Sequence, residues 1–409
     1  MSGAAAPRSR ARDVVWFATG MLLPVPWLVA HAFDGLGLPS EFTALLAGSA
    51  ILGSAFLLSW ACEVAERDIP QSLALLVLAL VGVLPEYAID LHFAWVAGKD
   101  PAYASYAIAN MTGANRLLIG FGWTAVVLAA CWKGRTRELT VHPRQQLELR
   151  FLAWATLYSF LIPLSGSVGL WDAVVLLALF FAYLRAALQG EYDEVELVGP
   201  ARLIDVEFQD MGRRAWAVGL FVFAAASIYL SAEPFAESLV HLGQNYDVDE
   251  FLLVQWVAPL ASESPEFVVA LLFALKLRGS VGIGALVSSK VNQWTLLVGA
   301  IPITYAISLG APRGLPLDAR QVEELLLTSA QSLLATIMLA DLRFSRREAL
   351  VLGALFVGPL FFASTTARWW FTGLYLVASF GLLTVGPRRQ RDAFLRLLFP
   401  RWGPAESET

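Results

Sequence analysis

Twelve apolar stretches dominate this sequence, and each is close to the length that a helix needs to cross a membrane. That length is roughly 20 mainly apolar residues. A chain in the bilayer must satisfy its backbone hydrogen bonds internally, and continuous apolar runs of this length do so as helices. We therefore predict an all-α, polytopic membrane protein with about twelve transmembrane helices. The stretches cover residues 14–32, 41–65, 70–97, 102–132, 149–164, 170–188, 214–242, 250–275, 281–309, 322–341, 348–365 and 368–386.

The composition agrees with a chain that lipid solvates. Apolar residues make up 57% of the 409 residues and charged residues 15%, against about 45–50% and about 25% in soluble domains. The two cysteines offer no disulfide framework. The four histidines show no metal-ligand spacing, and the chain has neither a phosphate-binding loop nor a nucleophile elbow. We expect the lipid bilayer as partner, no nucleic acid, no resident cofactor and no enzymatic activity.

The distribution of basic residues predicts the orientation. With the N-terminus inside, 23 of the 29 Lys and Arg residues fall on the inner side and four fall in outer loops. Cytoplasmic loops of membrane proteins carry such an excess. We predict an integral, multi-pass protein of the cell's inner or plasma membrane, with both termini in the cytoplasm. The two remaining basic residues, Arg116 and Lys290, lie inside apolar stretches.

A polar stretch divides the chain near its middle. Residues 189–213 are rich in acidic side chains and too few for a domain, so we predict a cytoplasmic connector. The N-terminal half, 1–188, is expected to hold an extra helix and a first repeat. The C-terminal half, 214–386, is expected to hold a second repeat and another extra helix. Residues 387–409 are expected to form a cytoplasmic tail.

A short motif occurs once in each half. It reads LPEY at 84–87 and SPEF at 264–267. An asparagine follows the glutamate after 29 residues in the first copy, as Asn115, and after 26 in the second, as Asn292. The predicted topology runs the two motifs through the membrane in opposite directions, so the repeats are inverted. Inverted repeats with interrupted helices are typical of secondary transporters.

Each motif predicts a helix break at mid-membrane depth. Pro85 and Pro265 lack an amide hydrogen, which frees the carbonyl about one turn earlier. In hydrocarbon such a carbonyl is tolerated only where it lines a cavity or meets a partner. The glutamate after each proline adds a carboxylate, and carbonyl and carboxylate oxygens are the ligands that calcium prefers. A single proline would indicate a plain kink, whereas two in corresponding positions favour a cation site.

Six charged residues in or near the two repeat motifs lie inside predicted helices. Each would cost about 2.5–3.5 kcal/mol at the bilayer centre, so that six without partners would cost on the order of 18 kcal/mol, more than the net stability of a typical protein. We expect them to pair with one another or with a bound ion; salt bridges that only hold helices together are the alternative. Four acids and two bases leave a charge of −2, which one divalent or two monovalent cations would balance. The six are Glu86, Asp90, Glu263, Glu266, Arg116 and Lys290.

The two repeats resemble those of the cation/calcium antiporter superfamily, which includes sodium/calcium and calcium/proton exchangers. The family pattern is Thr-Ser-x-Pro-Glu and, about 23 residues later, Gly-Ser-Asn with an Asn or Asp four residues after the serine. In the second repeat Ser289 follows Glu266 by 23 residues, and Gln293 follows Ser289 by four. The first repeat is similar at Glu86 and at Thr112.

The resemblance implies ten core helices in two inverted halves of five, alternating access, and exchange of one cation for another. Arg116 stands where the family has an amide or carboxylate, and Lys290 stands where it has an asparagine. Fewer coupled sodium ions, or protons in their place, are therefore expected. The cation-binding residues that the resemblance and the charge pattern together indicate, with Glu86 and Glu266 as the metal ligands, are Glu86, Glu266, Ser262, Glu263, Thr112, Asn115, Ser289, Asn292, Gln293 and Asp90.

Two functions of different classes follow from these patterns. The first is a secondary antiporter that exchanges Ca²⁺ or Na⁺ against Na⁺ or H⁺ at a midplane site formed by the two Pro-Glu breaks. In it, Arg116 and Lys290 would compensate charge by pairing with the carboxylates when the cation is absent. The alternative is a structural or sensory membrane protein without transport, in which Arg116 and Lys290 are permanent salt-bridge partners of the carboxylates.

Overall fold

The computed structural model describes residues 7–33, 37–65, 83–189, 197, 199–362 and 364–399. These residues are mostly helical, and they divide into two compact units that do not coincide with the two halves of the sequence. Unit 1 comprises Met1–Phe93 and Leu184–Pro265, and unit 2 comprises Ala94–Tyr183 and Glu266–Thr409. Each unit therefore takes helices from both repeats.

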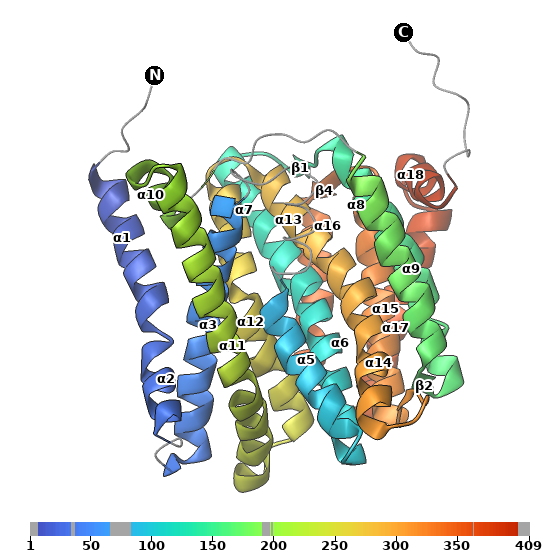
Figure 1. The fold of residues 1–409 in the computed structure, drawn as a ribbon. Coiled ribbons are helices and arrows are strands. Elements are labelled where there is room, and N and C mark those ends of the chain that lie inside the picture. Colours follow the sequence, from blue (N-terminus) through green and yellow to red (C-terminus); the bar gives the residue numbers. More distant parts are fainter. Residues whose placement is uncertain are drawn as a thin grey trace. The chain divides into compact units, whose positions relative to one another are not determined.

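Unit 1 is organised around two long helices, α3 and α11, which pack along each other. The helices α1, α2 and α10 pack against α3 (Figure 1). The helices that lie in or enter unit 1 are α1 (Pro7–Leu22), α2 (Val25–Ala32), α3 (Ser40–Ala65), α5 (Leu84–Ala97), α10 (Pro200–Glu207), α11 (Asp210–Tyr246) and α12 (Glu250–Leu275).

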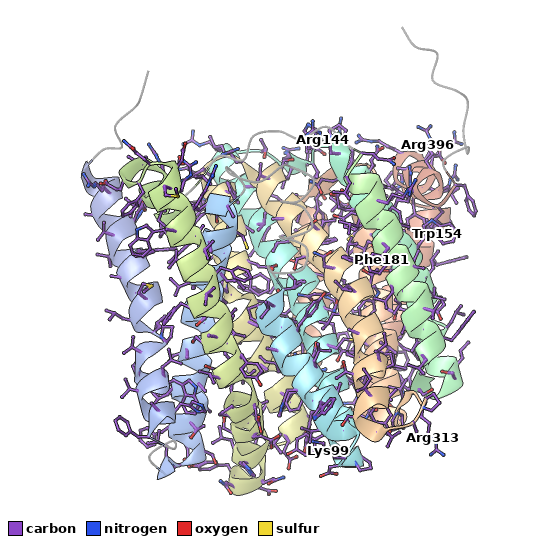
Figure 2. The ribbon with its side chains drawn as sticks, in the orientation of Figure 1. Lys99, Arg144, Trp154, Phe181, Arg313 and Arg396 are labelled. Carbon is purple, nitrogen blue, oxygen red and sulfur yellow. The ribbon has the colours of Figure 1, made fainter. Side chains whose placement is uncertain are left out.

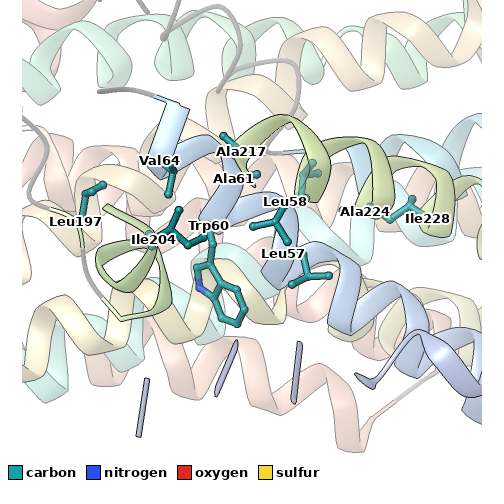
Figure 3. Packing of buried hydrophobic residues seen from close by; sticks show 12 residues of the cluster. Leu57, Leu58, Trp60, Ala61, Val64, Leu197, Ile204, Ala217, Ala224 and Ile228 are labelled. Atoms are coloured by element: carbon teal, nitrogen blue, oxygen red, sulfur yellow. The ribbon is translucent and has the colours of Figure 1, made fainter. Parts of the chain in front are cut away.

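An apolar cluster holds the connector helix α10 to the membrane helices of unit 1. Trp60 of α3 is 3% exposed and lies beside Ile204 of α10, while Ala224 and Ile228 of α11 extend the cluster along α3 (Figure 3). Burial of such side chains contributes about 1.5–3 kcal/mol each. The predicted connector 189–213 therefore includes a helix that is fixed by packing, and residues 190–196 and 198 lie outside the described part.

Unit 2 is built around α15, which packs against α6, α8 and α17. The helix α13 packs against α7 and α8. The helices of unit 2 are η2 (Pro101–Tyr103), α6 (Ala104–Leu117), η3 (Leu118–Trp123), α7 (Thr124–Gly134), η4 (Pro143–Gln145), α8 (Gln146–Ser159), η5 (Ile162–Ser165), α9 (Leu170–Ala187, to Tyr183), α13 (Gly279–Asn292), η6 (Gln293–Leu297), α14 (Val298–Leu309), α15 (Ala319–Leu339), α16 (Arg346–Phe361), α17 (Thr365–Thr384) and α18 (Arg388–Leu398).

Two short antiparallel sheets join loops of the two repeats within unit 2. The strand β1 (Glu138–Thr140) pairs with β4 (Arg343–Ser345), with Leu139 opposite Phe344. The strand β2 (Ser167–Val168) pairs with β3 (Leu315–Pro316). The two sheets lie at opposite ends of the helices of this unit (Figure 1).

The surface of unit 2 has the polarity expected of a membrane protein. Arg144 and Arg396 lie at one end of the unit and Lys99 and Arg313 lie at the other (Figure 2). Large apolar side chains such as Phe181, which is 58% exposed, occupy the surface between these ends. The predicted inner and outer basic residues are thus separated along the helices, with an apolar belt between them.

Helices occupy the described part of every predicted stretch, so the all-α polytopic class is confirmed. Among the described residues, eight helices are long and apolar enough to cross a membrane, and the pair α17 and α18, bent by 101°, is a ninth candidate. Three of the twelve predicted stretches are not among these nine. Stretch 70–97 is described only from residue 83 onward, α16 has 16 residues, and 281–309 forms α13, η6 and α14.

Each repeat contains a π-helical segment that the sequence did not reveal. In the first repeat η3 follows Asn115 after two residues, and in the second η6 follows Asn292 directly. A π-helical turn is rare and is often found at functional sites. Its occurrence at corresponding places supports the internal repeat.

Gly282 determines how closely α13 approaches α12. A Cβ atom at this position would overlap the backbone carbonyl oxygen of Ala270. Gly282→Ala should therefore destabilise the protein by about 1–3 kcal/mol, as overpacking in a filled core does. Thermal unfolding in detergent measures the change. Gly373→Ala is the matched control, because nothing lies within 4 Å of the Cβ it would add in α17; an equal loss in both variants would contradict the prediction.

Candidate cation-binding residues

Glu86 lies in the first turn of α5, at the position that the motif predicts to be functional. Pro85 precedes it and fits there, because the first turn of a helix does not need the missing amide hydrogen. The carboxylate of Glu86 is 1% exposed and accepts a hydrogen bond of 2.7 Å from the Ser262 hydroxyl of α12. A buried carboxylate at a helix N-terminus is favoured by the dipole of the helix.

Two further predicted acids are buried in unit 1. Asp90 follows Glu86 by one turn of α5 and Glu263 follows Ser262 on α12, and both side chains are almost fully enclosed. Three carboxyl groups are therefore buried in the described part of unit 1, and the Ser262 hydroxyl donates to one of them, that of Glu86. A further pair, which the sequence did not indicate, joins α5 to α11. His92 Nε2 of α5 is 3.1 Å from Glu237 Oε1 of α11. No local pattern links these two residues, which are 145 positions apart.

The structure corrects the helix break predicted at Pro265. The helix α12 runs continuously through Pro259 and Pro265. Since proline has no amide hydrogen, the carbonyl of Ala261 loses its helical hydrogen bond without any interruption of the helix. At Pro85 the helix α5 begins one residue earlier, at Leu84, and residues 66–82 lie outside the described part.

The remaining predicted ligands lie in unit 2. The Ser289 hydroxyl of α13 lies near the carboxyl group of Glu266 but makes no hydrogen bond with the described residues. The buried amide oxygen of Asn292 has no hydrogen-bond partner among the described residues, and an orphaned buried acceptor requires an explanation such as an ion or a water. Gln293 is also fully buried, at the start of η6.

The predicted ligands on α6 have their polar hydrogens directed to their own helix. The Thr112 hydroxyl donates to the carbonyl of Ile108 at 2.7 Å, and Asn115 Nδ2 donates to the carbonyl of Met111 at 2.7 Å. Their oxygens remain as acceptors. The Asn115 side-chain oxygen accepts a 2.7 Å hydrogen bond from Lys290 Nζ.

Arg116 takes part in a buried network that the sequence did not reveal. Its guanidinium donates to Glu324 of α15 at 2.6 Å. Arg368 of α17 donates to Glu323 at 2.8 Å and lies 3.7 Å from Glu324. The network contains two positive and two negative groups, so it is neutral when all are ionised, and it joins α6, α15 and α17.

This network changes two expectations. Arg116 was expected to pair with the cation-binding carboxylates, whereas the structure places it on Glu324. Arg368 was expected in an outer loop, whereas it is 6% exposed inside unit 2. The sequence does show two acids, Glu323 and Glu324, inside the predicted helix 322–341. No local pattern identifies their partners, because Arg116 and Glu324 are 208 positions apart.

Within the described residues, no group of three or more His, Cys, Asp or Glu side chains is arranged to hold a metal ion. The arrangement thus differs from a resident metal centre. A cation bound here would need hydroxyl, amide or carbonyl oxygens together with the carboxylates, which is the mixed oxygen set that calcium accepts.

The buried pair of Arg116 and Glu324 yields a test of stability. Glu324→Gln should destabilise the protein by about 3–5 kcal/mol, because it leaves an arginine buried without its counter-charge. The double variant Arg116→Met with Glu324→Met should be less destabilised than the single variant, because it removes both charges. Thermal unfolding of the purified variants measures both.

An exposed pair serves as the control for this test. Arg343 and Glu138 are 3.0 Å apart with roughly half of each side chain exposed, and Arg343→Met should change stability by about 0–1 kcal/mol. If the Arg116→Met, Glu324→Met double variant loses as much stability as Arg116→Met and Glu324→Met lose together, Arg116 and Glu324 do not act as a pair.

Comparison with known proteins places this geometry in a family. The family described as "Sodium/calcium exchanger protein" matches residues 40–189 and 216–365, one segment in each half of the chain. A search of curated protein sequences found no significant match.

Solved structures extend the comparison to the whole fold. A structure of an "H+/Ca2+ Exchanger CAX" is 42% identical, with a TM-score of 0.88, and the alignment covers 94% of this chain and 98% of that one. Native YfkE is 13% identical with a TM-score of 0.60, covering 89% of this chain and 99% of that one. The sodium-calcium exchanger NCX_Mj is 18% identical with a TM-score of 0.53, covering 80% and 98%; these last two show similarity of fold alone. The chain belongs to the sodium/calcium exchanger protein family, whose members are membrane cation transporters and not enzymes.

Proposed function

We propose that this protein is a secondary antiporter that exchanges Ca²⁺ for protons by alternating access. Glu86 and Glu266 are the proposed cation ligands, assisted by the hydroxyl and amide oxygens of Ser262, Ser289 and Asn292. The observation that carries the proposal is the hydrogen bond from the Ser262 hydroxyl to the buried carboxylate of Glu86. In the second repeat, the buried Ser289 hydroxyl lies near Glu266, and neither it nor the buried side-chain oxygen of Asn292 has a hydrogen-bond partner among the described residues.

The charges within the helices are compatible with one divalent cation together with one proton. Arg116 pairs with Glu324, and this pair is therefore left out of the charge count for the candidate carboxylates. Four acids and one base then leave −3 if all are ionised, and one Ca²⁺ with one proton would balance this charge. The groups counted are Glu86, Asp90, Glu263, Glu266 and Lys290.

The same charges explain why such a site would exchange ions obligatorily. A carboxylate inside the bilayer costs about 2.5–3.5 kcal/mol by insertion scales, and burial favours its protonated form. Release of the metal ion therefore has to be accompanied by uptake of protons. The 42% identical structure carries the name of an H⁺/Ca²⁺ exchanger, which supports protons as the counter-ion. Exchange involving Na⁺ is the second possibility.

Transport by the reconstituted protein tests the proposal. Proteoliposomes with an acidic interior should accumulate Ca²⁺, and collapse of the pH gradient should stop uptake. Glu266→Gln and Glu86→Gln should each reduce the initial rate by at least about tenfold, since loss even of groups that support a metal ligand costs about 10–100-fold. The measurement is radioactive Ca²⁺ uptake.

Glu138→Gln is the control for these variants, because Glu138 lies on β1 and pairs with Arg343 at an exposed position. Equal gradient-driven rates in the parent and in Glu266→Gln would refute the assignment. If a sodium gradient drives uptake and a pH gradient does not, the counter-ion is Na⁺ and not H⁺. Absence of all gradient-driven flux would favour the non-transporting alternative.

We also propose that both termini are cytoplasmic. Arg144 and Lys99 are exposed at opposite ends of unit 2 (Figure 2), and the native Cys62 and Cys131 are buried. A membrane-impermeant maleimide should label Lys99→Cys in intact cells, and Arg144→Cys only after permeabilisation. The unmodified protein, whose cysteines are buried, supplies the background. The reverse labelling pattern would invert the proposed orientation.

A further inference from the structure

The most unusual polar group outside the proposed ligands is Lys290. Its side chain is fully buried on α13 in unit 2. It is next in sequence to Ser289, which lies near Glu266. An ammonium group in this position has lost its water shell, so its protein partners have to replace that shell.

The partners of Lys290 resemble the coordination of a monovalent cation. Its Nζ donates to both oxygens of Asn115, at 2.7 Å to the side-chain oxygen and at 3.3 Å to the backbone carbonyl. The ring of Trp294 adds a cation–π contact, with Nζ 4.2 Å from its centroid. Amide oxygens and an indole face bind a cation through its charge, so these contacts do not depend on the ammonium group as such.

The backbone explains why Asn115 can offer two oxygens in one direction. Asn115 lies just before the change from α6 to the π-helical η3. At such a change the helical hydrogen bonds shift from i+4 to i+5 spacing, which alters the partners of nearby carbonyls. On the opposite side, Trp294 is held by the second π-helical segment, η6. The contacts of Lys290 thus lie beside both π-helical segments, since Asn115 precedes η3 and Trp294 belongs to η6.

We propose that Lys290 is a tethered cation: its ammonium group occupies a monovalent-cation position made by Asn115 and Trp294, and thereby excludes alkali-metal ions from that position. The inference rests on the proposed antiport and specifies its ion selectivity. The charge of Lys290 remains with the protein throughout the cycle, so no Na⁺ or K⁺ is needed, or admitted, at this position.

Removal of the tethered charge should create a binding site for alkali-metal ions. Lys290→Asn replaces the ammonium group by a neutral amide, whose oxygen can join those of Asn115 as a ligand, and Lys290→Met is a neutral side chain of similar length. Thermal unfolding of the full-length protein, without Ca²⁺ and at constant pH, is compared in NaCl, KCl and choline chloride of equal ionic strength. Both neutral variants should gain a saturable rise in Tm of about 2 °C or more with NaCl or KCl, because a ligand stabilises the state that binds it.

Two controls separate binding from a general effect of the substitution. Lys290→Arg keeps the charge and should, like the parent, have the same Tm in all three salts. Lys290→Asn combined with Asn115→Leu lacks the side-chain oxygen and should lose the response to NaCl and KCl. A purely structural role of Lys290 would lower Tm in the neutral variants without making it depend on the type of cation.

The proposal is overturned if the neutral variants respond to NaCl and KCl as they do to choline chloride, or if Lys290→Arg gains the response. If neither neutral variant folds, the parent decides: equal Tm in the three salts supports the tethered cation, and a saturable response to NaCl or KCl that Asn115→Leu abolishes overturns it. This assay involves no transport. Failure of Ca²⁺ uptake would therefore refute the antiport without changing the dependence of Tm on the salt. Equally, a Tm that does not respond to NaCl or KCl would refute the tethered cation without affecting the test of Ca²⁺ uptake.

Discussion

A charge inside a bilayer needs a partner, and this constraint governs the described interior of the protein. The sequence places acids and bases within apolar helices, and the structure answers them in three ways. Glu86 receives a serine hydroxyl, Arg116 receives a carboxylate, and Lys290 receives two oxygens and an indole face. Of these three residues, only Glu86 is among the proposed cation ligands. The neutral network around Arg116 joins α6, α15 and α17. The proposed cation site uses other acidic residues, Glu86 and Glu266.

Irregularities in the helices also accommodate polar groups inside the protein. The segments η3 and η6 alter backbone hydrogen bonding beside Asn115 and Asn292, the two asparagines that the repeats have in common. Pro265 removes one hydrogen bond from α12 without interrupting it. Gly282 lets α13 approach α12 closely. Polar backbone and side-chain atoms are thereby exposed inside the protein, where the surrounding helices shield them from lipid.

Much of this arrangement could be predicted because it follows from local and periodic patterns. Apolar stretch lengths predicted the helical membrane fold, and the recurrence of Pro-Glu with a following asparagine predicted the repeats and indicated the family. The orientation and the roles of the individual ligands remain predictions. Pro265 was wrongly expected to break its helix, because the effect of proline depends on whether neighbouring helices hold the helix together.

What the sequence alone determined is therefore the membrane environment, the helical class, the internal repeat and the residue types available for a cation. Each depends on spacing along the chain. Only the tertiary structure decided which charges neutralise one another. Arg116 and Glu324 are 208 positions apart, and Lys290 and Asn115 are 175 apart. Electrostatic energy depends on distance in space and on the local dielectric, and neither is encoded in the spacing of residues along the chain.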